Sequence, residues 1–157
     1  ACAPWPAQSV GWALDFTPGF YGGDPAARTD VVDRLGLAPL LRAPIGTLSK
    51  GQRKRVLLAI GLMAPHPVLL LDEPFDGLDL RQMRDVAHLL RSVASTGRTL
   101  FLSIHQIGDA ARVCDRFVLL SEGRVCGEGT LEELAARVPD AQGDSSQTLE
   151  GVFLALT

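Results

Sequence analysis

The 157-residue sequence is poor in cysteine and lacks an apolar run long enough to span a membrane. Its three cysteines, Cys2, Cys114 and Cys126, form no CxxC pair and have no metal-binding spacing, so we expect reduced thiols rather than a disulfide framework or a zinc site. A bilayer span requires roughly 18 to 20 apolar residues, and no run approaches that length. We therefore expect one globular domain, and the 46% hydrophobic content supports a sizeable core.

The sequence also lacks a strong charge of either sign. Fifteen basic and 18 acidic residues leave a formal net charge of -3, so no basic field favours nucleic acid or an anionic membrane surface, and we expect no nucleic-acid partner. Lysine occurs only at Lys50 and Lys54. Neither lysine fits the pattern G-x-x-x-x-G-K-[ST], so the printed residues contain no phosphate-binding loop of that kind.

What the sequence does contain is a stretch, residues 48–79, with two phosphate-handling patterns. The first is Leu48-Ser49-Lys50-Gly51-Gln52. Ser49 can cap the helix that follows, and Gly51 lets backbone come close to a ligand, so the N–H groups at the helix start would face an approaching anion. The basic residues after them would either favour that anion or be solvated charges on an exposed face; they are Arg53, Lys54 and Arg55.

The second pattern is an apolar run, 68–71, followed at once by Asp72 and Glu73. The run predicts a strand that is buried on both faces, as in parallel sheets. The two acids would then lie at the carboxyl edge of the sheet, where open α/β sheets bind ligands. Buried structural acids at a strand end are the alternative interpretation.

Four segments in this order resemble the motifs of the ATP-binding cassette (ABC) ATPases. LSKGQ resembles their signature motif, LLLDEP their Walker B motif, and the GLD at 77–79 their D-loop. His105, after the strand-like run 99–104, resembles their switch histidine. Lys50 departs from the commoner glycine at the third signature position. The agreement of four motifs in sequence makes the resemblance specific, although it covers only about the C-terminal two-thirds of a cassette.

The resemblance implies an α/β fold, a partial P-loop NTPase (RecA-like) ABC cassette with a helical subdomain that lacks the N-terminal β-subdomain and the P-loop. The expected divisions are a helical subdomain with the signature helix at 1–64, the C-terminal part of the ATPase core at 65–138, and a tail with a helix at 139–157. We interpret the chain as a truncated product or fragment, and we expect that alone it binds ATP weakly and does not hydrolyse it.

The resemblance also implies roles for single residues. Asp72 would hold Mg²⁺, mostly through water, and Glu73 would activate the attacking water as general base. His105 would contact the γ-phosphate, although a lone histidine at a strand end is often a satisfied polar residue. Asp79 would contact a partner subunit and cap the next helix. The segment from Leu48 to Gln52 would clamp ATP held by that partner.

The implied function is the ATP-binding subunit of an ABC transporter, which couples ATP hydrolysis to export through a separate membrane permease. Its partners would be a second ATPase subunit in a head-to-tail dimer and the permease, which would hold it at the cytoplasmic face of the membrane. The segment 149–157 resembles the C-terminal end of the ATPases of an export group, and GEGTLEEL resembles the segment that precedes that end. The alternatives are an ABC ATPase that acts on ribosomes or DNA and a catalytically incomplete regulatory module.

Pattern and capping signals predict the remaining elements. Helices are expected at 10–16, 30–35, from Ser49, at 80–94, near 109–114, at 131–138 and at 149–156, with a loop at 17–24. Strands are expected at 68–71, 99–104, 117–121 and 124–126. Four aromatic residues of the first segment are expected either to contact the permease or to form a small core; they are Trp12, Phe16, Phe20 and Tyr21.

Overall fold

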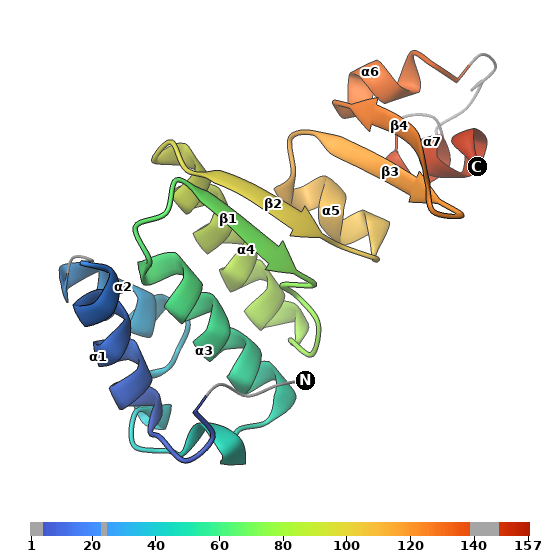
Figure 1. Cartoon of the computed structure of the whole chain (residues 1–157). Coiled ribbons are helices and arrows are strands. Elements are labelled where there is room, and N and C mark those ends of the chain that lie inside the picture. Colours follow the sequence, from blue (N-terminus) through green and yellow to red (C-terminus); the bar gives the residue numbers. More distant parts are fainter. Residues whose placement is uncertain (1–4, 23–24, 139–147) are drawn as a thin grey trace. The chain divides into compact units, whose positions relative to one another are not determined.

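The computed structural model describes residues 5–22, 25–138 and 148–157. The chain divides into two compact units, unit 1 from Ala1–Ser103 and unit 2 from Ile104–Thr157 (Figure 1). The predicted boundaries after 64 and 138 remain predictions, and residues 139–147 of the predicted tail lie outside the described residues. Unit 1 contains, in order, α1 (Val10–Tyr21), α2 (Pro25–Arg34), η1 (Ala38–Leu40), η2 (Ile45–Thr47), α3 (Lys50–Met63), β1 (Val68–Asp72), α4 (Leu80–Ser95) and β2 (Thr99–Ser103).

Helix α1 is longer than the sequence pattern indicated. The Ser9 side chain caps it as predicted, but the helix continues through Pro18 to Tyr21, so the loop predicted from residue 17 is wrong. Proline removes one backbone donor from a helix. Here the turn is supported nonetheless, because the Thr17 hydroxyl donates to the Ala13 carbonyl at 2.9 Å and the Gly22 N–H donates to the Pro18 carbonyl at 2.9 Å. Helix α1 ends only at Gly22, whose φ is 72°.

Helix α2 also begins earlier than predicted. It starts at Pro25, four residues before the expected cap Thr29, which agrees with the preference of proline for the first helical position. Its end follows the prediction, since Gly36 adopts a φ of 60° just beyond Arg34. Together α1, α2 and α3 pack against one another in unit 1 (Figure 1).

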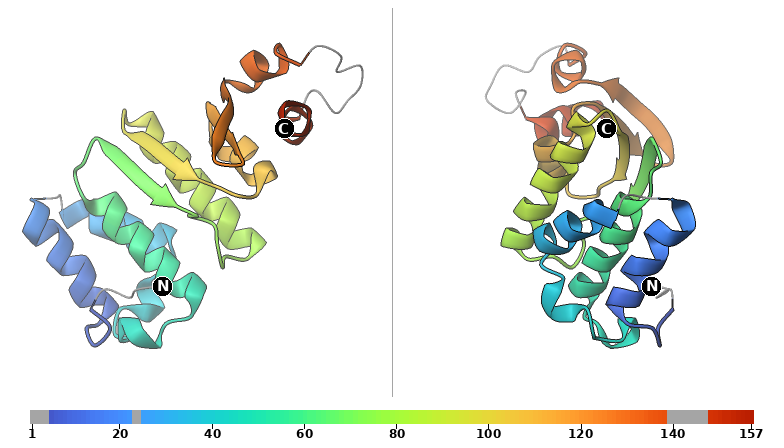
Figure 2. Two further views of the ribbon diagram at one scale, coloured as in Figure 1. Left: turned by 45° about the vertical axis from the view of Figure 1, so that its right-hand side comes forward. Right: turned by 90° about the vertical axis from the view of Figure 1, so that its left-hand side faces the viewer.

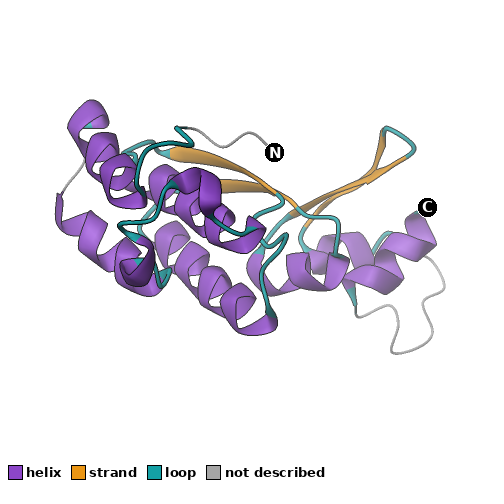
Figure 3. Cartoon of the chain, turned by 90° about the horizontal axis from the view of Figure 1, so that it is seen from below, coloured by secondary structure: helices purple, strands orange, loops and turns teal. Residues whose placement is uncertain are grey.

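The sheet of unit 1 consists of β1 and β2 in parallel register, with Leu69 opposite Leu100 and Leu70 opposite Phe101. Alternate side chains of a strand point to opposite faces. On one face Leu69 is only 6% exposed and packs beside Gly61 of α3. On the other face Leu70 is 76% exposed and Phe101 is 61% exposed. The prediction that β1 is buried on both faces is therefore wrong for the described chain, because the helices of unit 1 cover one side of the strands (Figure 3).

Helix α4 follows its predicted pattern closely. Asp79 caps its first turn, and the helix runs from Leu80 to Ser95 before the chain turns at Gly97, where φ is 93°. Its buried residues are Val86, Leu89 and Leu90, whereas Leu80 at its start is 76% exposed. Between α4 and β2, Arg98 donates from its guanidinium to the carbonyls of Leu62, Ala64 and His66 at 2.8 to 3.0 Å. Partial burial lowers the pKa of Arg98 from its ordinary value.

In the residues that the structure describes, unit 2 is an antiparallel hairpin accompanied by short helices (Figures 1 and 2). Its elements are α5 (Ile107–Val113), β3 (Phe117–Ser121), β4 (Arg124–Gly129), α6 (Leu131–Ala135) and α7 (Leu149–Leu156). The predicted capping box at Thr130 and Glu133 is confirmed, although α6 ends three residues earlier than expected and β4 extends three residues further. A small core joins the hairpin to α6 and α7 through Leu119, Leu134, Leu149 and Val152.

Among the described helices, none has the length and apolar character that a membrane crossing requires.

Candidate functional site

The segment Leu48-Ser49-Lys50-Gly51-Gln52 forms the start of α3. The Ser49 hydroxyl accepts from the Gln52 N–H at 3.2 Å, and the Gln52 side-chain oxygen accepts from the Ser49 N–H at 2.9 Å. This reciprocal capping box satisfies two donors that would otherwise lack partners at the helix start. Leu48 is buried and anchors the segment, whereas Ser49 and Lys50 are exposed. The predicted cap is confirmed, and the nucleotide contact remains a prediction.

Gly51 has a structural reason to be glycine within this chain. A Cβ atom at this position would lie 2.4 Å from the carbonyl oxygen of Gly77, which is closer than any real contact. The close approach that the sequence suggested for a ligand is here made by the backbone of the turn after β1. Any side chain at position 51 would push the start of α3 away from that turn.

Asp72 and Glu73 lie at the carboxyl end of β1, as predicted. Asp72 is paired with Ser103 of β2, so both side chains point to the open face of the sheet, and the Ser103 hydroxyl donates to Asp72 Oδ1 at 2.5 Å. Asp72 is exposed and Glu73 is half-buried. The alternative of two acids enclosed in an apolar interior therefore does not describe this site.

The donor set at Asp72 fits a magnesium ion. Mg²⁺ prefers oxygen ligands and usually keeps several waters beside one or two carboxylates. Asp72 offers an exposed carboxylate at the sheet edge with a serine hydroxyl beside it. Its backbone carbonyl is already occupied, because Lys54 donates to it from Nζ at 3.1 Å. The side chain, rather than the backbone, is thus the group that could hold a metal.

Glu73 has an unusual backbone conformation. Its φ is 46°, in the left-handed region that non-glycine residues seldom adopt. The Glu73 N–H donates to the Ser103 carbonyl at 3.1 Å, which holds the residue against β2 in this conformation. Strain of this kind concentrates at functional sites, where the surrounding structure maintains it. No residue pattern predicts this conformation.

Residues 73–79 form a compact turn that connects β1 to α4. The Asp76 N–H donates to the Glu73 carbonyl and the Leu78 N–H to the Phe75 carbonyl, both at 3.1 Å. At the end of the turn, Asp79 Oδ1 accepts from the Gln82 N–H at 2.9 Å and caps α4, as predicted. The expected contact of Asp79 with a partner subunit remains a prediction.

One contact of this turn was missed by sequence reasoning. Lys50 Nζ lies 2.8 Å from Asp76 Oδ1 and 2.7 Å from Oδ2, so both carboxylate oxygens contact the ammonium. The stem of Lys50 passes over Gly77, where a Cβ atom would meet it at 3.1 Å. The one hint of this contact in the sequence is Lys50 itself, because the family more often has glycine at this position of the signature motif.

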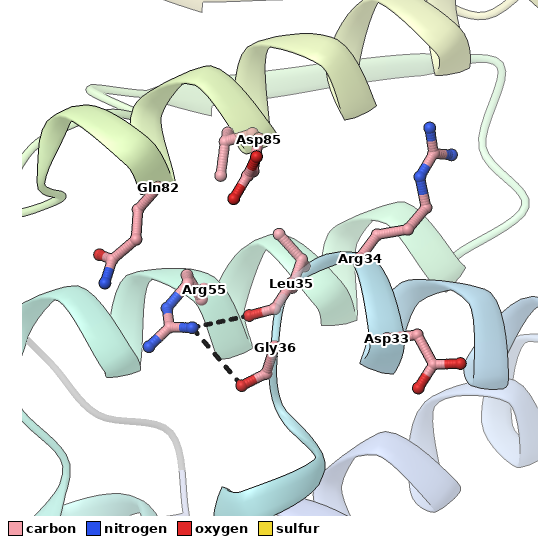
Figure 4. Close-up of a pocket in the computed structure, with 8 residues that line it drawn as sticks. Asp33, Arg34, Leu35, Gly36, Arg55, Gln82 and Asp85 are labelled. Carbon is pink, nitrogen blue, oxygen red and sulfur yellow. Dashed lines mark hydrogen bonds between the residues drawn. The ribbon is translucent and has the colours of Figure 1, made fainter.

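Arg55, another cation of α3, contacts backbone carbonyls and is not simply a solvated surface charge. Arg55 Nη1 donates to the carbonyls of Leu35 at 2.8 Å and Gly36 at 3.5 Å, at the end of α2 (Figure 4). Arg55 thereby lines a pocket between α2, α3 and α4, together with Asp33, Arg34, Leu35, Gly36, Gln82, Asp85 and Val86. The predicted site residues do not line this pocket.

His105 belongs to unit 2; it precedes α5 in the sequence and its side chain is exposed. The strand before it ends at Ser103, one residue earlier than predicted. Its predicted contact with the γ-phosphate, and its proximity to Asp72, remain predictions.

Exposed aromatic rings run along α1. Neighbouring ring centroids lie 5.0 to 5.7 Å apart in a continuous series. The series comprises Trp5, Trp12, Phe16, Phe20, Tyr21 and His66. Phe20 is 68% exposed and even Trp12 is 39% exposed. These rings therefore form a surface cluster, here called the aromatic cluster, and not the small core considered as an alternative.

Known proteins resemble this chain in sequence and in fold. The profile of the ABC transporter family matches residues 19–76. The thiamine import ATP-binding protein ThiQ of Jannaschia sp. (strain CCS1) is 38% identical over 127 residues, which cover 79% of this chain and 56% of ThiQ. The nickel import ATP-binding protein NikO of Rhodobacter capsulatus is 40% identical over 109 residues, which cover 68% of this chain and 43% of NikO.

A solved structure supports the fold. The ATP-binding subunit of an ABC transporter superposes with a TM-score of 0.84 at 24% identity, covering 97% of this chain and 63% of that subunit. The chain thus spans about half the length of the curated relatives that it matches. The expected partial cassette fold is confirmed, and the chain belongs to the ATPase family of the ABC transporters.

Proposed function

We propose that this chain is part of an ATP-binding subunit that drives solute transport through a separate membrane permease. The observation that carries the proposal is the folded order of three motifs in unit 1. The capped signature segment, the acids at the end of β1 and the capping Asp79 follow one another on a single compact unit. Export, which the C-terminal resemblance favours, and import, which the names of the relatives describe, use the same ATPase chemistry.

Each proposed role uses a feature of the described structure. Asp72 would hold Mg²⁺ through its exposed carboxylate, and Glu73 would take a proton from the attacking water. Mg²⁺-ATP, when bound, would supply the γ-phosphoryl group that passes to water, with ADP as the leaving group. Ser49, Gly51 and the first N–H groups of α3 bind the triphosphate on a second ATPase subunit in a head-to-tail dimer. Asp79 contacts that subunit, and His105 contacts the γ-phosphate.

The decisive experiment supplies the phosphate-binding loop that the printed residues lack. A P-loop-bearing segment from a complete ABC ATPase is fused before this chain, and Mg²⁺-dependent ATP hydrolysis is measured. Glu73→Gln should lower kcat by about 10² to 10⁴, the usual contribution of a general base. Glu122→Gln is a matched control, because Glu122 also has a left-handed φ, of 49°, but lies in the turn between β3 and β4.

The fused protein must also be folded for this test to count. Its circular dichroism and its unfolding midpoint establish that, and equal rates for the two glutamine variants would refute the role of Glu73. The 157 residues alone provide a second test, for which we expect weak binding of radiolabelled ATP and no turnover. Tight magnesium-dependent binding by the separate chain would contradict the proposal that the phosphates are held mainly by a P-loop.

We assign the permease contact to the aromatic cluster, which offers exposed aromatic area at the surface of the helical region. This contact would place the protein at the cytoplasmic face of the membrane. The fused protein can be expressed with the permease that serves the donor of the P-loop segment. Phe20→Ser should reduce co-purification of that permease, whereas Leu154→Ser, a control at an equally open position of α7, should not. Equal recovery of the permease with both variants would refute the assignment.

A further inference from the structure

We propose that Lys50 is a positioning residue that fastens the turn 73–79 to the start of α3, so that the signature segment and the acid-bearing turn move together. Lys50 follows the cap residue Ser49, and its ammonium contacts both carboxylate oxygens of Asp76 at 2.7 and 2.8 Å. The two residues are 26 positions apart in the sequence. The contact therefore joins two segments that the backbone connects only through α3 and β1.

Backbone packing leaves little freedom for a different arrangement. The carbonyl oxygen of Gly77 occupies the space that a Cβ atom at position 51 would need. Gly77 itself has a φ of 80°, and the Lys50 stem covers its Cα. The lysine thus contributes both an apolar cover for the turn and a charge at its centre. A shorter residue at position 50 could provide neither.

A second lysine of α3 holds the beginning of the same turn. Lys54 donates to the Asp72 carbonyl at 3.1 Å, one helical turn along α3 from Lys50. The segment that carries Glu73 is therefore held by α3 at both ends, at Asp72 and at Asp76. These two contacts couple the start of α3 to this segment, so a displacement of one should shift the other.

We call the two contacts, Lys50 with Asp76 and Lys54 with Asp72, the clamp. Its role in catalysis rests on the proposed ATPase function, but its existence does not. An exposed ion pair contributes little to global stability, and the Lys50 side chain is 66% exposed. Its effect should consequently appear in the local order of the turn and not in the unfolding midpoint. Salt should weaken it, because exposed charges are screened within a few ångströms at high ionic strength.

The test is amide hydrogen exchange on the 157-residue protein at low salt. Lys50→Met, which keeps the apolar stem and removes the charge, should speed exchange of the Asp76 and Leu78 amides roughly two- to five-fold, in line with an exposed pair. Exchange in α4 should not change. Lys50→Arg should restore slow exchange, and Arg84→Met is the control for loss of one positive charge at an exposed position of α4.

Each outcome decides the matter. Faster exchange confined to the turn, rescue by arginine, and loss of the difference in 1 M salt would support the clamp. Unchanged exchange in Lys50→Met, or the same acceleration in Arg84→Met, would overturn it. In the fused ATPase, Lys50→Met should lower kcat roughly two- to five-fold with KM unchanged. A rise in KM alone would instead make Lys50 a ligand contact, and an inactive fusion with an intact exchange effect would refute the ATPase function while the clamp stands.

Discussion

The two faces of the β1–β2 sheet differ sharply although both are apolar. Leu69 is 6% exposed and faces α3, whereas its neighbour Leu70 is 76% exposed on the opposite face. In a parallel sheet both faces are normally covered. A continuous run of leucines therefore predicts a strand, but it does not predict which of its side chains are buried. Burial depends on which face of the strand the helices cover.

The open face also carries the candidate chemistry. Asp72 and Ser103 stand on it, at the carboxyl end of the strands, and Phe101 and Val68 extend it as exposed apolar surface. The covered face carries the fold, through Leu69 and the buried stripe of α4. Stability and proposed function are thus assigned to opposite sides of the same two strands.

The largest expected effect is that of truncation on the covered face. Leu69→Ala should reduce the free energy of unfolding by about 2 to 4 kcal/mol, since it removes buried methyl groups and leaves a cavity. Leu70→Ala should change it by at most about 0.5 kcal/mol, as for other exposed positions. Urea unfolding followed by circular dichroism measures both. Equal losses would show that the open face is covered in solution.

An intermediate loss in the free energy of unfolding is expected from substitution of Arg98, which precedes β2. Arg98→Met removes three hydrogen bonds to the carbonyls of Leu62, Ala64 and His66 and should cost about 1 to 3 kcal/mol. Arg81→Met, on the exposed side of α4, provides the comparison for loss of a charge alone. The same urea titration applies. A cost for Arg98→Met no greater than that for Arg81→Met would mean that the three carbonyls are satisfied without it.

The smallest effect on stability should come from charge on the open face. Leu70→Lys should leave the free energy of unfolding within about 0.5 kcal/mol of the parent protein, because the side chain already contacts water. It should nevertheless lower self-association and the binding of apolar dyes, since it interrupts an exposed apolar patch. Light scattering and dye fluorescence test this. Unfolding caused by Leu70→Lys would contradict the assignment of the two faces.

Local features of the fold could be predicted from the sequence. The capping boxes at Ser49 and Thr130 involve residues three positions apart, so their geometry follows from the helix start alone. The burial of Val86 and Leu90 on α4 follows from helical periodicity, whereas that of Leu89 and the exposure of Leu80 do not. Pro18 misled the prediction of α1, because the support that the helix receives from Thr17 and Gly22 is not visible in composition.

Features that depend on distant residues could not be predicted in this way. The pairing of Lys50 with Asp76 and the left-handed conformation of Glu73 both arise from how α3, β1 and β2 meet. Hydrophobic periodicity describes one helix or strand at a time, so it does not predict contacts between different elements. The positions of the acids were predicted because they follow directly from the end of a strand, while their chemical roles rest on the family resemblance.

Under the proposed function, the left-handed conformation of Glu73 implies a trade-off between the stability of the fold and catalysis at one residue. An L-residue in this region costs about 1 to 2 kcal/mol relative to glycine. Glu73→Gly should therefore raise the free energy of unfolding, and under the proposed function it should abolish ATP hydrolysis. The residue proposed as the general base would thus lower the stability of the folded chain by that amount, because glycine adopts a positive φ without the steric cost.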